Sequence, residues 1–199
     1  MIYLVRHGQT VFNAEGRFQG HRDSTLTDLG CVQATAVGRR LRAELGDPAR
    51  VVFESSPQGR AVQTAELLRA EIAGLPAARL DPRLCEIGLG SWEGLTQADL
   101  EARWPGAWRG SVRQSWVAGC PDGETWAAAR SRLRAWLDGA MAAASAEAPR
   151  LAVSHGVAIA ILRALWLGLS QTEAMALPVA QGVIWRLDPG AVTAMGAWP

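Results

Sequence analysis

The chain of 199 residues contains no lysine, because arginine supplies all 20 of its basic residues. The absence of lysine excludes catalysis through a lysine Schiff base, and it excludes the phosphate-binding lysine of P-loop proteins and of kinases. The formal net charge is only +1. Neither nucleic acid nor a membrane surface is therefore expected as a general partner.

Cysteine and histidine are also scarce, with three of each. The cysteines, at positions 31, 85 and 120, are too few and too scattered for a disulfide framework, and their odd number fits a reducing compartment. We therefore expect a cytoplasmic protein. The histidines lack metal-ligand spacing and no HExxH motif is present, so the sequence predicts a site that works without metal or another cofactor.

Short apolar runs alternate with segments of helical pattern along most of the chain. Strands are expected at residues 2–5, 51–53, 151–153, 183–187 and 192–195, and helices at about 26–45, 59–73, 97–103, 124–144 and 157–167. The helix at 157–167 is far shorter than the ~20 residues that cross a bilayer, and we expect it to be buried. The alternation predicts one domain over residues 1–199, built on a parallel sheet with covering helices.

Residues 86–123 break this alternation and predict a small inserted cap. Glycine and proline are frequent there, together with Trp92, Trp104, Trp108 and Trp116. Aromatic side chains more often form core than recognition elements, so packing of the cap is the favoured role for tryptophans in residues 92–126. An aromatic lid over a ligand is the alternative. The arginines at 103, 109 and 113 are expected to be solvated, unless one of them binds a second negative group of a ligand.

Three predicted strand ends are followed by basic side chains. Arg6 and His7 end the first strand, Arg60 follows the strand at 51–53, and His155 follows the strand at 151–153. Ligand sites in open α/β sheets lie outside the carboxyl ends of the strands. Guanidinium groups bind phosphate oxygens through a planar set of donors, and a neutral imidazole can attack phosphorus. The pattern therefore predicts a phosphate clamp beside a histidine nucleophile.

The same segments carry an ordered series of motifs. They read RHGQT at 6–10, VFNAEGRFQGHRDSTLTDLG at 11–30, SSPQGRAVQTA at 55–65, EIGLGSWEG at 86–94 and SHG at 154–156. In this order the chain resembles the histidine phosphatase superfamily nearly end to end, and within it the broad-specificity phosphatase branch more than the phosphoglycerate mutases. The resemblance implies a three-layer α/β/α fold, a small phosphorylated metabolite as the partner, and a phosphohistidine intermediate.

The resemblance also implies roles for individual residues. His7 would be the nucleophile and Glu86 the general acid, which then serves as the base toward water. The substrate phosphate would contact Arg6, Asn13, Gln19, Arg60, His155 and Gly156, with His155 protonated beside the bound dianion. Glu93 is the competing carboxylate, for which we expect a structural role. His21 is expected to lie in a surface loop.

Three functions remain open at this point: a phosphomonoesterase, a cofactor-dependent phosphoglycerate mutase, and a non-catalytic module that binds phosphorylated ligands. Mutases of the family carry a lysine and other basic residues after the Glu86 motif, whereas residues 87–100 of this chain contain none. Arg109 or Arg113 could substitute for them. A non-catalytic member would be expected to lose the histidine or the acid, and both are present. The substrate and the oligomeric state are left open.

Overall fold

The computed structural model describes residues 1–142 and 148–197. Its centre is a six-stranded sheet with the strand order β3-β2-β4-β1-β5-β6. The strands are β1 (Ile2–Arg6), β2 (Val52–Ser55), β3 (Arg79–Leu80), β4 (Arg150–Ser154), β5 (Val183–Asp188) and β6 (Ala191–Gly196). β1 to β4 are parallel, whereas β5 and β6 add two antiparallel strands at one edge. The predicted α/β fold with a mostly parallel sheet is confirmed.

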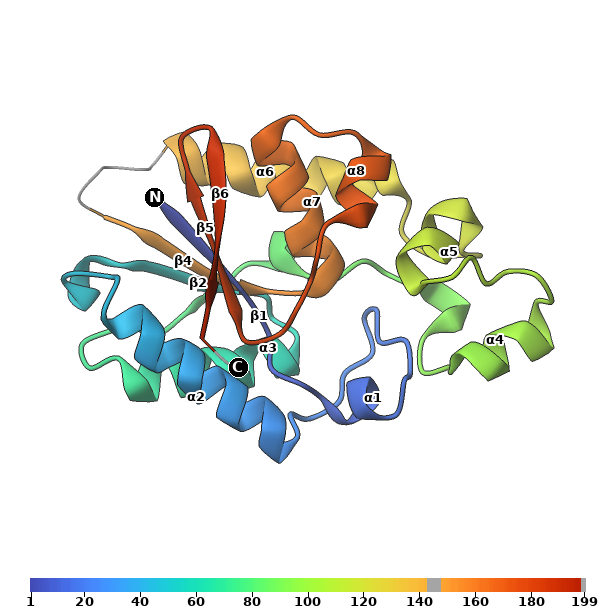
Figure 1. Cartoon of the computed structure of the whole chain (residues 1–199), viewed down its shortest axis with the longest axis horizontal. Helices are drawn as coiled ribbons and strands as arrows, with labels where there is room; N and C mark the ends of the chain where they lie inside the picture. Colours follow the sequence, from blue (N-terminus) through green and yellow to red (C-terminus); the bar gives the residue numbers. More distant parts are fainter. Residues whose placement is uncertain (143–147, 198–199) are drawn as a thin grey trace.

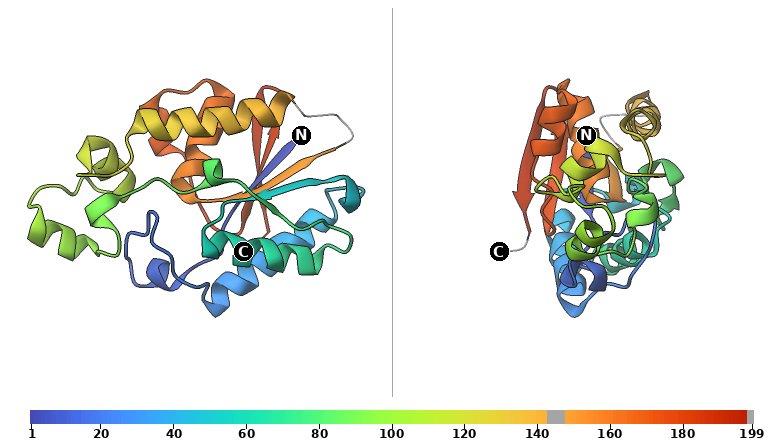
Figure 2. Two further views of the ribbon diagram at one scale, coloured as in Figure 1. Left: turned by 180° about the vertical axis from the view of Figure 1, so that it is seen from behind. Right: turned by 90° about the vertical axis from the view of Figure 1, so that its right-hand side faces the viewer.

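Helices cover both faces of this sheet (Figures 1 and 2). On one face lie α2 (Asp28–Arg42) and α3 (Gly59–Glu71), and on the other α6 (Trp126–Ala142), α7 (Gly156–Leu167) and α8 (Gln171–Ala176). The helices predicted at 26–45, 59–73, 124–144 and 157–167 are therefore found, the first three with shorter bounds and the last with one additional residue at its start. Residues 143 and 144 of the third prediction lie outside the described residues.

The first strand explains why its residues are continuously apolar. Tyr3 and Val5 pack into the core beneath α2 and α3, whereas Ile2 and Leu4 pack into the core beneath α6 and α7. Successive side chains of a strand point to opposite faces, so a strand covered on both sides has no polar face. Arg6 is the first residue of β1 at which this burial is relaxed.

The predicted buried helix is α7, which follows β4 directly. Ten of its twelve residues are buried. It ends at Gly168, whose φ of 70° is the left-handed conformation that glycine adopts without strain. Among the residues that the structure describes, no helix is both long and apolar enough to cross a membrane.

Shorter elements form the rest of the chain: α1 (Val11–Ala14), η1 (Pro48–Arg50), η2 (Pro82–Leu84), η3 (Gly90–Trp92), α4 (Gln97–Arg103) and α5 (Val112–Gly119). The last two project beyond one end of the sheet (Figure 1). The sequence predicted α4 but not α5. An N-terminal cap, in which Ser111 accepts from the Gln114 N–H, and the burial of Trp116 stabilise this short helix.

Candidate active site

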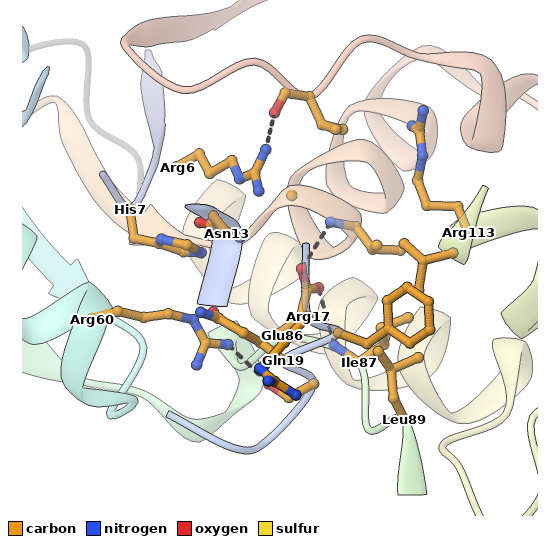
Figure 3. Close-up of a pocket in the computed structure, with 16 residues that line it drawn as sticks. Arg6, His7, Asn13, Arg17, Gln19, Arg60, Glu86, Ile87, Leu89 and Arg113 are labelled. Atoms are coloured by element: carbon orange, nitrogen blue, oxygen red, sulfur yellow. Dashed lines mark hydrogen bonds between the residues drawn. The ribbon is translucent and has the colours of Figure 1, made fainter. Parts of the chain in front are cut away.

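A cavity of about 160 Å³ lies at the carboxyl ends of β1 and β4 (Figure 3). Its polar wall is formed by Arg6, His7, Asn13, Arg17, Gln19, Arg60, Glu86 and Arg113. The apolar wall is formed by Phe18, Ile87, Leu89, Val112, Val157 and Val179. In Figure 3, His7, Arg6 and Arg60 gather on one side and Arg113 lies on the other. One end of this small cavity is therefore strongly cationic, and the other end is lined by apolar side chains and Arg113.

His7 is buried immediately after β1, where its backbone N–H donates to the carbonyl of Ser154 at 3.0 Å. Its Nδ1 donates to the carbonyl of Gly8 at 2.8 Å, which leaves the lone pair on Nε2. Burial and then the charges of Arg6 and Arg60 hold the pKa of His7 well below its usual value. The structure thus presents a neutral imidazole in the tautomer that a phosphorus nucleophile requires.

The turn after His7 is fixed by the two helices below it. The backbone N–H of Gly8 donates to the Thr64 hydroxyl of α3 at 3.1 Å. A Cβ atom at Gly8 would lie 2.3 Å from the carbonyl oxygen of Gly30 in α2, so only glycine permits this contact. Tight backbone packing therefore sets the position of His7 relative to α3.

Arg6 lies against the first turn of α7. Its Nη1 donates to the carbonyl of Val179 at 2.6 Å, and its buried Nε has no hydrogen-bond partner in the described part of the chain. A Cβ at Gly156 would lie 3.3 Å from that Nε. The glycine of the SHG motif therefore makes room for the guanidinium, and a donor remains available for an anion.

Arg60, in the first turn of α3, is anchored on all three nitrogens. Nη1 donates to the carboxylate of Asp23 at 3.0 Å and to the carbonyl of Arg22 at 2.8 Å. Nη2 donates to the carbonyl of Gly20 at 2.8 Å, and Nε donates to Nδ1 of His155 at 3.2 Å. These bonds fix a buried positive charge at the cavity wall.

His155 is brought to the site but not onto the cavity wall. Its ring centroid lies 5.2 Å from that of His7, and the residue is fully buried. Nε2 donates to the Ser56 hydroxyl at 2.8 Å while Nδ1 accepts from Arg60, so the ring is neutral here. Burial, and next the charge of Arg60, hold its pKa well below the usual value. The protonated, phosphate-contacting form of His155 stays a prediction for the ligand-bound state.

Asn13 and Gln19 both line the cavity. The Asn13 carbonyl oxygen accepts from the Thr10 N–H at 3.2 Å and from Nε2 of Gln181 at 3.0 Å, so its amide NH₂ is the part that can face a ligand. Nε2 of Gln19 donates to the hydroxyls of Thr10 and Ser24. A contact between this nitrogen and phosphate would require one of these bonds to be exchanged.

Glu86 lies where the cavity meets the N-terminus of α7. Its carboxylate accepts from the N–H groups of Val157 at 3.1 Å, Ala158 at 3.0 Å and Ile87 at 3.0 Å. The first N–H groups of a helix have no partner within the helix and favour an acceptor of this kind. These bonds hold a carboxyl group at the wall of a cavity that also exposes His7.

Glu93 makes different contacts and does not line the cavity. Its carboxylate accepts from the backbone N–H groups of His21 at 2.7 Å, Leu89 at 3.0 Å and Arg22 at 3.1 Å. It thereby ties the loop that supplies Gly20 to the segment after Glu86. These contacts favour the structural role expected for Glu93. His21 is exposed, as expected for a loop residue.

Sequence reasoning assigned no site role to Arg17 or Phe18, which lie within the motif at 11–30 and line the cavity. Arg113, which was expected to be solvated unless it bound a second negative group of a ligand, also lines the cavity. Phe18 stacks on Trp108, with ring centroids 5.9 Å apart and planes 10° apart. No tryptophan of residues 1–142 and 148–197 lines the cavity itself. Trp92 and Trp116 are buried in the core, as the favoured interpretation expected.

The two buried histidines predict a pH dependence of folding. In the unfolded chain a histidine gains its proton below about pH 6.5. His7 and His155 have lower pKa values when folded, so the unfolded state binds more protons below that pH. Their contribution to the free energy of unfolding should therefore be complete above about pH 6.5. Below that pH the free energy of unfolding should fall by at most about 1.4 kcal/mol per pH unit for each histidine.

Denaturant unfolding between about pH 7 and pH 5, above the range in which unfolded carboxylates titrate, measures this slope. The double variant His7→Gln/His155→Gln should show a flatter slope than the unmodified chain. An unchanged slope in the double variant would show that these side chains are not held neutral by the fold.

No group of three or more histidine, cysteine, aspartate or glutamate side chains in the described ranges is arranged to hold a metal ion.

The profile of the histidine phosphatase superfamily (branch 1) matches residues 2–193. A relative from Erwinia tasmaniensis, named probable phosphoglycerate mutase GpmB, is 36% identical over 188 residues, which are 94% of this chain and 84% of the relative.

Two solved structures are similar to this fold. Mycobacterial glucosyl-3-phosphoglycerate phosphatase Rv2419c in complex with VO3 has a TM-score of 0.77 and 30% identity, covering 93% of this chain and 92% of that one. Bacillus stearothermophilus YhfR has a TM-score of 0.80 and 31% identity, covering 96% and 93%. Together with the family match and the convergence of His7, Arg6 and Arg60, these similarities show that the chain belongs to branch 1 of the histidine phosphatase superfamily.

Proposed function

We propose that the protein is a phosphomonoesterase that hydrolyses small phosphorylated metabolites through a phosphohistidine on His7. The observation that carries this proposal is the shared cavity. It exposes a neutral His7 between two guanidiniums, and it holds the Glu86 carboxyl group on the same wall. Rv2419c, a relative of solved structure, is a phosphatase by name and its structure is a complex with VO3, which supports a phosphate-sized ligand for this fold.

In the first step, Nε2 of His7 attacks phosphorus as the bond to the ester oxygen breaks. The leaving oxygen takes a proton from Glu86 and departs as an alcohol. The transferring group carries its charge on the equatorial oxygens, where positioned cations and N–H donors stabilise it. Arg6, Arg60, the Asn13 amide and the Gly156 N–H would supply these donors.

In the second step, a water molecule attacks phosphorus in the phosphohistidine. Glu86, now ionised, accepts the proton of the water while the bond from phosphorus to Nε2 breaks. Inorganic phosphate and neutral His7 result, and Glu86 is again protonated. Atoms and charges balance without a further reactant.

A phosphoglycerate mutase is the second candidate, and one observation favours it. Arg17 and Arg113 line the cavity beyond the guanidiniums of the clamp, where they could bind the carboxylate of a phosphoglycerate. Arg113 belongs to the proposed cap at 86–123. The name of the Erwinia tasmaniensis relative, probable phosphoglycerate mutase GpmB, points the same way. A mutase would return the phosphoryl group from His7 to the substrate instead of transferring it to water.

The two functions separate in one assay. The protein is incubated with 3-phosphoglycerate primed by 2,3-bisphosphoglycerate and, in parallel, with a panel of phosphomonoesters. We expect release of inorganic phosphate to exceed isomerisation, because residues 87–100 supply no basic side chain. Isomerisation that outpaces phosphate release would replace the phosphatase proposal by the mutase.

Variants of the cap refine the result. If Arg113 binds a second anionic group, Arg113→Gln should raise the KM for phosphorylated acids about tenfold more than it raises the KM for neutral phosphomonoesters. The exposed Arg109, which does not line the cavity, provides the matched control Arg109→Gln.

A further inference from the structure

Residues 177–181 lie between α8 and β5 and are called the strap below. Three successive carbonyl groups of the strap each accept a hydrogen bond from an arginine. Nη1 of Arg113 donates to Leu177, Nη1 of Arg163 donates to Pro178 and Nη1 of Arg6 donates to Val179, each at 2.6 Å. The three donors come from α5, α7 and the end of β1. Charge-assisted bonds of this length are strong, so the path of the strap is fixed from three sides.

The strap also contacts a second residue expected to bind phosphate. Nε2 of Gln181 donates to the carbonyl oxygen of Asn13 at 3.0 Å, which orients the amide so that its NH₂ can face a ligand. Val179 itself lines the cavity, and the bond from Arg6 to its carbonyl is drawn in Figure 3. Two of the residues expected to bind phosphate, Arg6 and Asn13, are therefore held by the same short segment. Together with Arg60 they are called the phosphate clamp below.

Arg163 is the strap's anchor that lies outside the cavity. It is 5% exposed, and its guanidinium carbon lies 3.4 Å from the centroid of the Trp185 ring. Burial lowers its pKa to about 10, which still leaves it charged at neutral pH. Burying a charge is costly unless specific contacts compensate it. The ring of Trp185 and the carbonyl of Pro178 supply that compensation.

We propose that the strap positions the phosphate clamp and that Arg163 is the positioning residue that fixes the strap. The inference rests on the proposed function, because phosphate is the ligand that the clamp would bind. Arg6 has a long side chain with several rotatable bonds, and ordering such a side chain when a ligand binds costs conformational entropy and so lowers the affinity. The bond to the Val179 carbonyl orders Arg6 before the ligand binds, but only if the strap holds that carbonyl in place.

Binding of inorganic phosphate, measured by calorimetry, tests this without turnover. Arg163→Met removes the bond to Pro178 and should weaken phosphate binding by about tenfold. Arg163→Lys keeps a cation over Trp185 that can donate to Pro178, and it should retain affinity within about threefold. In an Arg6→Met background, Arg163→Met should have a much smaller effect, limited to the part that acts through Asn13, because residues that act through one another are non-additive.

A second variant loosens the strap without touching the core. Pro178 is exposed, and Pro178→Gly keeps its carbonyl while freeing the backbone. We expect inorganic phosphate to bind several-fold more weakly to it. Pro189→Gly, in the exposed turn between β5 and β6, is the matched control and should bind phosphate like the unmodified chain.

Two results separate the two claims. If the unmodified protein binds no inorganic phosphate, the proposed function fails and this inference fails with it. If it binds phosphate but Arg163→Met and Pro178→Gly bind it equally well, only the inference is overturned. Additive effects of Arg163→Met and Arg6→Met would also overturn it, because they would show that Arg163 does not act through Arg6.

Discussion

Replacing His7 by alanine is expected to reduce kcat/KM for every phosphomonoester by about 10⁴-fold or more, because removing a nucleophile removes the covalent route entirely. The structure gives this side chain the three properties that the role needs: the neutral form, a bond from Nδ1 to the Gly8 carbonyl, and a place on the cavity wall. Steady-state assays of phosphate release measure the loss.

The control for this variant is His21→Ala. His21 is exposed and does not line the cavity, but its Nε2 donates to the backbone carbonyl of Glu86 at 3.1 Å. Its replacement removes this one bond, so kcat should fall by no more than about tenfold, far less than for His7→Ala. Circular dichroism and thermal unfolding should show that both variants are folded. Substantial turnover by a folded His7→Ala protein would show that another residue attacks phosphorus, or that water attacks directly.

Replacing Glu86 by glutamine is the second change with a large expected effect. The amide preserves the shape of the side chain but cannot give its proton to the leaving oxygen. For alkyl phosphates, whose alkoxide is a poor leaving group, we expect phosphoenzyme formation to slow by about 10²- to 10⁴-fold. For 4-nitrophenyl phosphate, which needs little protonation, the first-turnover burst should slow far less.

Glu93→Gln separates this role from that of the neighbouring carboxylate. Glu93 accepts three backbone N–H groups in the loops at 20–22 and 89, so its replacement should lower the melting temperature but affect all substrates equally. A loss in Glu86→Gln that is equal for nitrophenyl and alkyl phosphates would argue against proton donation. A dependence on the leaving group in Glu93→Gln would move the acid to that residue.

The parts of the site that could be predicted from the sequence are those set by strand ends. Arg6 and His7 follow an apolar run, and Arg60 follows another, so their meeting at one edge of the sheet follows from local pattern and from the rule for parallel strands. The main helices were predictable for the same reason, since their apolar spacing and caps are local signals.

Contacts between distant segments could not be predicted. The bond from Val157 to Glu86 joins positions 71 residues apart, and the bond from Arg6 to Val179 joins positions 173 residues apart. Arg113 and Leu177 are 64 residues apart, and Arg163 and Pro178 are 15 residues apart. Nothing local signals which carbonyl an arginine will reach. β3 was missed because a two-residue strand has no period to detect.

The position of His155 was predicted from the sequence, but the hydrogen-bond partners of its ring were not. Its motif placed it near the phosphate, and the structure brings its ring beside that of His7. Whether a ring nitrogen faces the cavity depends on Ser56 and Arg60, which occupy both nitrogens in this structure. Phosphate contact by His155 therefore requires at least one of these two bonds to be replaced by a bond to the ligand.

One measurement tests the central claim most directly: locating the phosphoryl group during turnover. The protein is mixed with a phosphomonoester, quenched in alkali within the first turnover, and mapped by mass spectrometry under conditions that preserve phosphohistidine. The account predicts a single phosphorylated residue, His7, with phosphorus on Nε2. A phosphoryl group on His155 or any other residue, or a burst of alcohol release with no phosphorylated protein, would contradict it.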